Sequence, residues 1–265
     1  MSTATITPRK LGRLPRSHDR RIPMMHTLQG SMALPPVVPS VDYTTNMPAD
    51  LGVMGNDTLG DCTCAAVYHA IQVWSFNGSG TIDTEPDADV VDLYELACGY
   101  NPNKGGEGPG GNEQHVLTYI LNNGAPSGSN GQQRRKIDAF VEIDVKNTDN
   151  VKRTIYDCGV AYIGFNVPQY IMPPNADPLP VWDVNPNADN TIIGGHAVVL
   201  AGYDANGARV ISWGEYYTMT WAFFAQFVDE AYAIADAMWI TAKNATPGGL
   251  TLQQLEQAMQ ALKGS

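Results

Sequence analysis

The chain has 265 residues, of which 43% are hydrophobic and 16% are charged. This composition is typical of a folded globular protein with ample apolar material for a core, and it excludes an intrinsically disordered chain. The net charge of −11 argues against nonspecific nucleic-acid binding by the body of the protein. No stretch of sequence approaches the roughly 18 to 20 apolar residues of a membrane span, so no membrane partner is expected.

Basic residues are concentrated at the start of the chain. Residues 1–22 contain Arg9, Lys10, Arg13, Arg16, Arg20 and Arg21 against the single acid Asp19, whereas the remainder is strongly acidic. Residues 1–33 are predicted to form an extended basic arm that docks on its own acidic body or on an anionic partner. A solvated, mobile terminus is the alternative.

Targeting and redox signals favour an intracellular protein. The basic first residues contain no apolar run of the length of a secretory signal. We therefore expect a cytoplasmic location or incorporation in a larger assembly. Four cysteines are few enough for a reduced chain, although a Cys98–Cys158 disulfide remains open.

The first half of the chain predicts helices. The proline-rich segment 34–39 excludes a helix or a central strand, and residues 44–61 indicate a loop. Asp61 is placed to cap a buried helix that starts near Cys62 and carries apolar residues at helical spacing as far as Trp74. Further helices are expected at 90–97 and 113–123, on either side of a glycine-rich loop at 101–112.

The second half changes to patterns typical of strands. A short helix is expected at 150–156 and a hairpin turn at 204–207. The predicted strands, rich in β-branched and aromatic residues, are 139–145, 160–167, 197–202, 208–213 and 237–241. We therefore predict an α+β fold with a helical lobe at 34–130, a mostly antiparallel β lobe at 131–245 and a C-terminal amphipathic helix within 246–265.

Two segments 134 positions apart carry the residue types of thiol catalysis. Cys62 lies at a predicted helix N-terminus, where the helix dipole and the backbone N–H groups favour a thiolate. His196, at the start of a predicted strand, is a candidate general base for that thiol. Asn56 precedes Cys62 by six residues, and its side-chain amide with the Cys62 backbone N–H would form an oxyanion hole.

Each of these residues also has a structural alternative. Cys62 could be a buried structural residue, which is the most frequent role of a free cysteine. His196 could be a histidine in a sheet whose ring nitrogens are hydrogen-bonded within the core. Asn56 could be a turn residue. Cys64 is a second candidate nucleophile in the same helical turn. Cys62, Cys64 and His69 do not complete a tetrahedral set, so neither a metal nor a cofactor is expected.

The motifs around these residues resemble those of the papain-like cysteine peptidases over most of the chain. Pro39-Ser40-Val41-Asp42-Tyr43 is similar to the segment that opens the mature domain of that family, and Gly110-Gly111 to the pair that lines its substrate cleft. The most specific match is His196-Ala197-Val198, followed by Gly202-Tyr203 and Ser212-Trp213-Gly214. Asp61 directly before Cys62 resembles the bacteriocin-processing peptidases of the same superfamily.

The resemblance implies a two-lobed fold with a helical lobe, an antiparallel β-barrel-like lobe and an active-site cleft between them. It implies Cys62 as nucleophile, His196 as base, Asn56 in place of the family's oxyanion-hole glutamine, Gly110 and Gly111 on the cleft, and Trp213 as a shield over His196.

One departure concerns the third catalytic residue. The asparagine that orients the family's histidine is replaced by Ile211, which cannot accept a hydrogen bond from an imidazole N–H. Ser212 is adjacent, but its side chain is expected to face away on a regular strand.

The predicted function is thiol-dependent hydrolysis of a peptide or amide bond through a thioester, with a peptide or protein as substrate. Two alternatives stay open at this point. The same Cys-His pair would also serve an acyl transferase or peptide ligase, and the replacement by Ile211 together with the basic arm would suit a noncatalytic structural or assembly protein with a papain-like fold.

Overall fold

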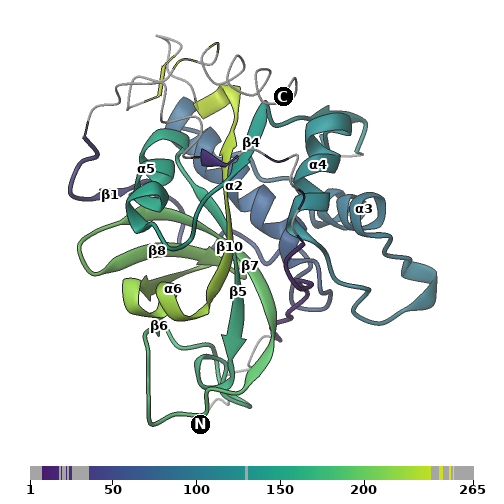
Figure 1. The fold of residues 1–265 in the computed structure, drawn as a ribbon. Coiled ribbons are helices and arrows are strands. Elements are labelled where there is room, and N and C mark those ends of the chain that lie inside the picture. The colour runs from purple at the N-terminus through teal and green to yellow at the C-terminus, as the bar shows by residue number, and fades with distance from the viewer. Residues whose placement is uncertain are drawn as a thin grey trace.

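A sheet with helices on both faces forms the body of the protein (Figure 1). The computed structural model describes residues 8–17, 19, 22, 24–25, 36–128, 131–239, 245–246, 251 and 253. Within them the helices are α2 (Cys62–Ser79), α3 (Asp87–Cys98), α4 (Glu113–Asn123), α5 (Thr148–Cys158) and α6 (Trp221–Phe227), with short 3₁₀ turns η1 (Pro102–Lys104), η2 (Gln169–Ile171) and η3 (Ala237–Trp239). None of the described helices is both long and apolar enough to cross a membrane.

The large sheet is almost entirely antiparallel. Its order is β4 (Ala139–Glu142), β10 (Val228–Ala235), β5 (Ala161–Pro168), β7 (Ile192–Tyr203), β8 (Gly207–Ser212), β9 (Glu215–Thr220) and β6 (Val181–Trp182). Among the strands that the structure describes, only β6 pairs in parallel, with β9, and the short β1 (Val41–Asp42) also pairs with β7. β2 (Ala125–Ser127) and β3 (Gln133–Arg135) form a separate hairpin. The described strands thus build an open sheet and do not close into a barrel.

The prediction failed near the end of the chain. The expected strand at 237–241 is wrong over 237–239, which form η3, and the preceding strand β10 was missed. Asp229 and Glu230 at the start of β10 interrupt the apolar pattern that identifies a buried strand. The C-terminal helix predicted within 246–265 lies almost wholly outside the described residues, and the division into lobes at residue 130 stays a prediction.

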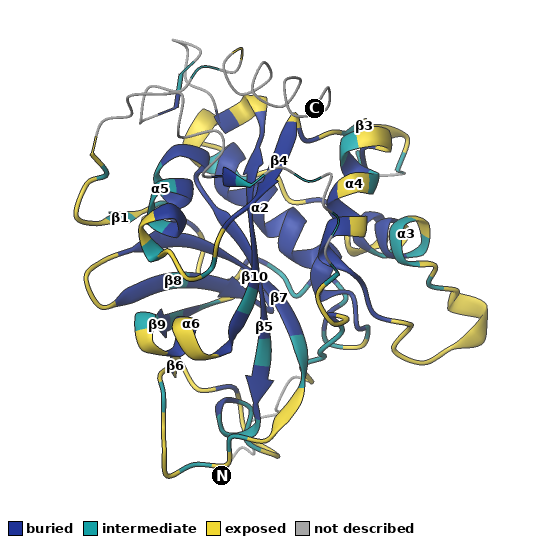
Figure 2. Cartoon of the chain, in the orientation of Figure 1, coloured by how far each residue is buried: buried dark blue, intermediate teal, exposed yellow. Residues whose placement is uncertain are grey.

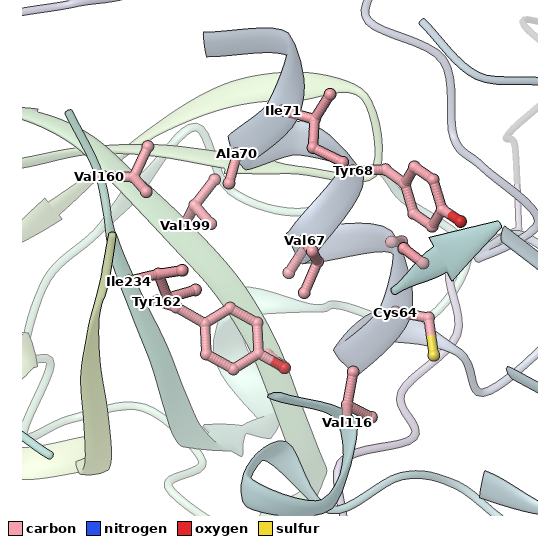
Figure 3. Packing of buried hydrophobic residues seen from close by; sticks show 14 of the residues in the cluster. Cys64, Val67, Tyr68, Ala70, Ile71, Val116, Val160, Tyr162, Val199 and Ile234 are labelled. Atoms are coloured by element: carbon pink, nitrogen blue, oxygen red, sulfur yellow. The ribbon is translucent and has the colours of Figure 1, made fainter. Parts of the chain in front are cut away.

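Helix α2 forms the centre of one core and is buried along most of its length (Figure 2). Figure 3 shows Val67 and Ala70 of this helix near Val199 of β7. These side chains are small enough for the helix to lie close to the sheet. At its first turn, the buried Tyr162 hydroxyl of β5 donates a hydrogen bond to the Thr63 carbonyl at 2.9 Å. The start of the helix is thereby fixed against the sheet.

The two faces of β7 enter different cores, because side chains alternate along a strand. Ala197, Val199 and Ala201 pack in the core that contains α2. Val198 and Leu200 pack in the second core, with residues of α5 and α6. The same alternation assigns His196 to the face of Val198.

Candidate active site

Cys62 is the first residue of α2, and its neighbours come from distant parts of the chain. The residue is 1% exposed, and its thiol accepts backbone hydrogen bonds from Ala197 of β7 and from Gly12. Gly12 belongs to residues 8–17, here called the N-terminal segment. Burial raises the pKa of the Cys62 thiol to about 12, and these two hydrogen bonds only partly oppose that shift. The fold therefore brings the thiol to the backbone of Ala197, the residue next to His196, and burial keeps the thiol protonated. In this conformation no described hydrogen bond joins the thiol to the His196 imidazole, whose side chain lies on the opposite face of β7 from Ala197.

Two aromatic side chains, Trp213 and Phe165, pack against His196. Its ring stacks on Trp213, with centroids 4.3 Å apart and planes at 15°, and meets the edge of Phe165 at 5.9 Å. Burial lowers the pKa of His196 to about 3, so the imidazole is neutral at physiological pH. Nε2 lies 2.7 Å from the Ser212 hydroxyl, and buried Nδ1 has no hydrogen-bond partner among the described residues.

The contact with Ser212 corrects the expectation that this side chain faces away from His196. Val199 pairs with Ile211 across β7 and β8, so Ile211 points into the core beside α2. Ser212, the next residue, therefore shares the opposite face with Val198 and His196. The register of the two strands, which sequence spacing did not supply, places the serine at the imidazole.

Trp213 reaches the imidazole from a tight turn. Ser212 pairs with Glu215, which leaves Trp213 and Gly214 as a two-residue connection with φ values of 49° and 76°. A positive φ is strained for a tryptophan, by roughly 1 to 3 kcal/mol, and such strain is concentrated at functional positions. The Trp213 indole N–H also donates to the Lys10 carbonyl at 3.2 Å.

Asn56 lies in the loop before α2 and is 2% exposed. Its side-chain amide donates to the Leu59 carbonyl at 2.9 Å, and its own backbone carbonyl accepts from the Lys10 N–H at 2.9 Å. In this conformation the amide helps to hold the loop that leads into the Cys62 helix.

Asp61 does not act as the predicted side-chain cap of α2. It occupies the residue before the helix, but its side chain makes no capping hydrogen bond, and its backbone carbonyl accepts from Cys64 and Ala65. The carboxyl group is fully buried, and burial raises its pKa to about 8. A protonated aspartic acid therefore stands directly beside Cys62 at neutral pH.

The predicted cleft residues Gly110 and Gly111 contact the N-terminal segment. The Leu14 N–H donates to the Gly111 carbonyl and the Gly111 N–H donates to the Gly12 carbonyl, each at 2.8 Å. From the other side, the N–H groups of Gly12 and Arg13 both donate to the Gly195 carbonyl of β7 at 3.2 and 3.0 Å. Residues 12–14 are thus hydrogen-bonded to Gly111 before α4 and to Gly195 of β7, and Gly12 also contacts the Cys62 thiol.

Glycines allow this close approach. A Cβ added to Gly12 would fall 1.9 Å from the Gly60 carbonyl oxygen, and one on Gly110 would fall 2.4 Å from the Gly12 carbonyl oxygen. One on Gly195 would fall 2.6 Å from the Arg13 carbonyl oxygen. The groove around the thiol therefore fits an extended backbone and has no room for side chains at these positions.

Charged contacts accompany the backbone pairing. Arg9 lies 3.0 Å from Glu215, Lys10 pairs with Glu107, and Arg16 pairs with Glu142. These basic residues belong to the cluster that the sequence identified. Glu107 lies in the loop before α4, Glu215 in β9 and Glu142 in β4. These carboxylate partners were not predicted from the sequence.

Comparison with known proteins supports the fold. No family model and no curated protein sequence matches the chain. Among solved structures, xylellain, a cysteine protease from Xylella fastidiosa, is 18% identical with a TM-score of 0.62, over 89% of this chain and 99% of its own. Digestive procathepsin L 3 of the Tenebrio molitor larval midgut is 14% identical with a TM-score of 0.52, over 76% of this chain and 71% of its own.

The Carica candamarcensis cysteine protease CMS1MS2, solved in complex with E-64, is 15% identical with a TM-score of 0.51, over 76% of this chain and 99% of its own. The chain thus has the papain-like fold, in a divergent sequence. The papain-like α+β fold that the sequence resemblance implied is confirmed, with an open sheet in place of a closed barrel among the described strands.

Proposed function

We propose that this protein is a thiol-dependent hydrolase of peptide or amide bonds. The observation that carries the proposal is the contact of a helix-terminal thiol with the backbone of Ala197, the residue next to buried His196. His196 Nε2 is hydrogen-bonded to Ser212, and Nδ1 has no partner among the described residues. Cys62 attacks the substrate carbonyl, and His196 Nδ1 accepts the thiol proton and later protonates the leaving amine. Water then releases the acyl group from the thioester.

Ser212 provides the hydrogen bond to the His196 imidazole that Ile211 cannot form. When His196 Nε2–H donates to the Ser212 hydroxyl, the Nδ1 lone pair is left available as the base. The stacked Trp213 ring fixes the plane of the imidazole and excludes water from it. Asn56 and the Cys62 backbone N–H supply the oxyanion contacts once the Asn56 amide turns from the Leu59 carbonyl.

The N-terminal segment holds the enzyme in a latent state. Gly12 covers the thiol, and residues 12–14 occupy the backbone hydrogen-bonding groups of Gly111 and Gly195 that a peptide substrate needs. Displacement of this segment would expose the thiol, reduce the burial that raises its pKa and open the groove.

Chemical labelling and product analysis test the proposal. The full chain is incubated with a peptidyl vinyl sulfone and with a peptide library, and adducts and products are identified by mass spectrometry. We expect one adduct, on Cys62, and cleaved peptides that disappear in Cys62→Ser and in His196→Ala. Cys64→Ser, which alters the other cysteine of the same helical turn two residues later, is the matched control and should retain both signals.

Two results would redirect the proposal. Aminolysis products formed with an added amine, in place of hydrolysis, would identify a transferase or ligase. Absence of any Cys62 adduct and of cleavage, also after the N-terminal segment is loosened by Gly12→Ala, would leave a noncatalytic papain-like protein.

A further inference from the structure

Arg13 projects from the N-terminal segment into a pocket of carboxylates. Its side chain is 1% exposed, with Nε 3.3 Å from Glu113 Oε2 and Nη2 2.8 Å from Glu230 Oε2. Nη2 also pairs with Asp229 at the rim of the pocket. Although burial opposes it, the charges of Glu113, Asp229 and Glu230 raise the pKa of the guanidinium above its ordinary value.

The pocket belongs to the body of the protein and is built for a cation. Glu113 begins α4 and Glu230 lies on β10, and both side chains are fully buried. The second oxygen of Glu230 accepts a hydrogen bond from Tyr232 at 2.5 Å, whereas Oε1 of Glu113 has no partner among the described residues. Burial and the neighbouring Glu230 raise the pKa of Glu113 well above its usual range. Two buried carboxyl groups side by side are costly without a positive charge between them.

The pocket lies close to the thiol, because the charge of Glu113 acts on Cys62. Gly164 of β5 pairs with Ala197, the residue whose backbone contacts the Cys62 thiol. A Cβ on Gly164 would fall 2.0 Å from Arg13 Nε and 2.4 Å from Glu113 Oε2, so this glycine leaves the space that the guanidinium fills. Arg13 itself pairs with Gly111 on one side and Gly195 on the other.

We propose, on the basis of the function above, that this acidic pocket selects a peptide substrate with an arginine side chain close to the scissile bond. Any extended peptide that hydrogen-bonds to Gly111 and Gly195 presents one side chain to Glu113 and Glu230, as the arm presents Arg13. Arginine suits the pocket better than lysine, because contacts at both Nε and Nη2 use the guanidinium fork. Arg13 thus occupies the specificity pocket of its own enzyme.

The test uses pairs of peptidyl vinyl sulfones in which one member carries arginine and the other its neutral isostere citrulline. One pair is made for each of the first, second and third residues from the electrophile. The rate of Cys62 labelling is measured on full-length Gly12→Ala, a variant designed to displace the N-terminal segment and keep the pocket intact. We expect the arginine probe to label at least about 10-fold faster at one of the three positions. Equal rates at all three positions would overturn the proposal.

Variants of the pocket make the assignment specific. Glu230→Gln and, separately, Glu113→Gln should bring the arginine-to-citrulline ratio close to one. Glu107→Gln removes a carboxylate that pairs with Lys10 outside the pocket, and should leave the ratio unchanged. Retention of the ratio in both pocket variants would contradict the proposal. Arg13→Ala in the full chain vacates the pocket by a second route and should show the same preference as Gly12→Ala.

Failure of the proposed function looks different from failure of this inference. If Cys62 is not a catalytic nucleophile, neither probe labels it in a His196-dependent manner. If only the specificity is wrong, both probes label it in a His196-dependent manner and at the same rate.

Discussion

The two proposed catalytic side chains are both neutral in this conformation, but for different structural reasons. Cys62 is covered in part by Gly12, a residue of the N-terminal segment, and its pKa rises to about 12. His196 is enclosed by Phe165 and Trp213, residues of the sheet and its hairpin, and its pKa falls to about 3. The N-terminal segment that covers the thiol can be displaced, whereas the aromatic residues around the imidazole belong to the folded core.

This difference separates control of the site from its construction. A change in the N-terminal segment should alter the reactivity of Cys62 and leave His196 in place. A change in the hairpin should alter the tautomer and orientation of His196 and leave the thiol covered. The predictions that follow test this separation, from the largest expected effect to the smallest.

Gly12→Ala should increase iodoacetamide labelling of Cys62 at pH 7 by about 100-fold, because the new methyl group cannot fit against the Gly60 carbonyl and a less buried thiol ionises more readily. The measurement is the alkylation rate, followed by mass spectrometry of the intact protein. Leu14→Ala, a change at an exposed residue of the same segment, is the control and should have little effect. An unchanged rate in Gly12→Ala would show that the segment does not limit access to the thiol.

Ser212→Ala should lower kcat/KM roughly 10- to 100-fold, because Nε2 loses the partner that fixes the tautomer of His196. Ser212→Thr, which keeps the hydroxyl, should recover most of the activity. Nitrogen chemical shifts of His196 report the tautomer directly. If Ser212→Ala retains full activity and the same shifts, the serine has no positioning role.

Acidification should destabilise the fold through His196. Its pKa is about 3 when folded and about 6.5 when unfolded, so below pH 6.5 the unfolded chain binds a proton that the folded protein does not. The free energy of unfolding should fall by up to about 1.4 kcal/mol per pH unit from this group as the pH drops from 6.5 toward 3. Urea unfolding at several pH values measures the slope, and His196→Gln should reduce it by one proton. An unchanged slope would mean that His196 is charged in the folded protein.

Asp61 should contribute a slope of the same maximum size and the opposite sign. Its pKa is about 8 when folded and near 4 when unfolded, so between these values the folded protein holds a proton that the unfolded chain has lost. Stability should therefore fall as the pH rises from 4 to 8, and Asp61→Asn should remove this component in the same urea experiments. A variant that keeps the original slope would show that Asp61 is ionised in the fold.

Glu107→Gln should have the smallest effect. Its contact with Lys10 is largely exposed, and exposed ion pairs contribute about 1 kcal/mol or less. Labelling of Cys62 should rise less than about 5-fold. A rise as large as that in Gly12→Ala would assign the closure of the segment to surface charge and not to backbone fit.

Local sequence patterns predicted the elements that carry Cys62 and His196, but not the contacts between distant elements. The start of α2 at Cys62 follows from signals within a short segment, and the motif at His196 indicated a strand that the structure contains. The assignment of Gly110 and Gly111 to a substrate cleft stays a prediction. The contact between Ser212 and His196 did not follow, because it depends on the register between β7 and β8, which a β-bulge in this pair shifts. Strand β10 was not predicted, because two carboxylates interrupt its apolar pattern. Both form ion pairs with Arg13, which lies more than two hundred residues earlier in the sequence.

The contact between Gly12 and the Cys62 thiol is also intramolecular, and this has a consequence for any competitor. A segment tethered to its own groove acts at an effective concentration in the millimolar range, and dilution of the protein does not reduce it. A free peptide must therefore exceed that local concentration, or bind correspondingly more tightly, before it reaches the sulfur atom.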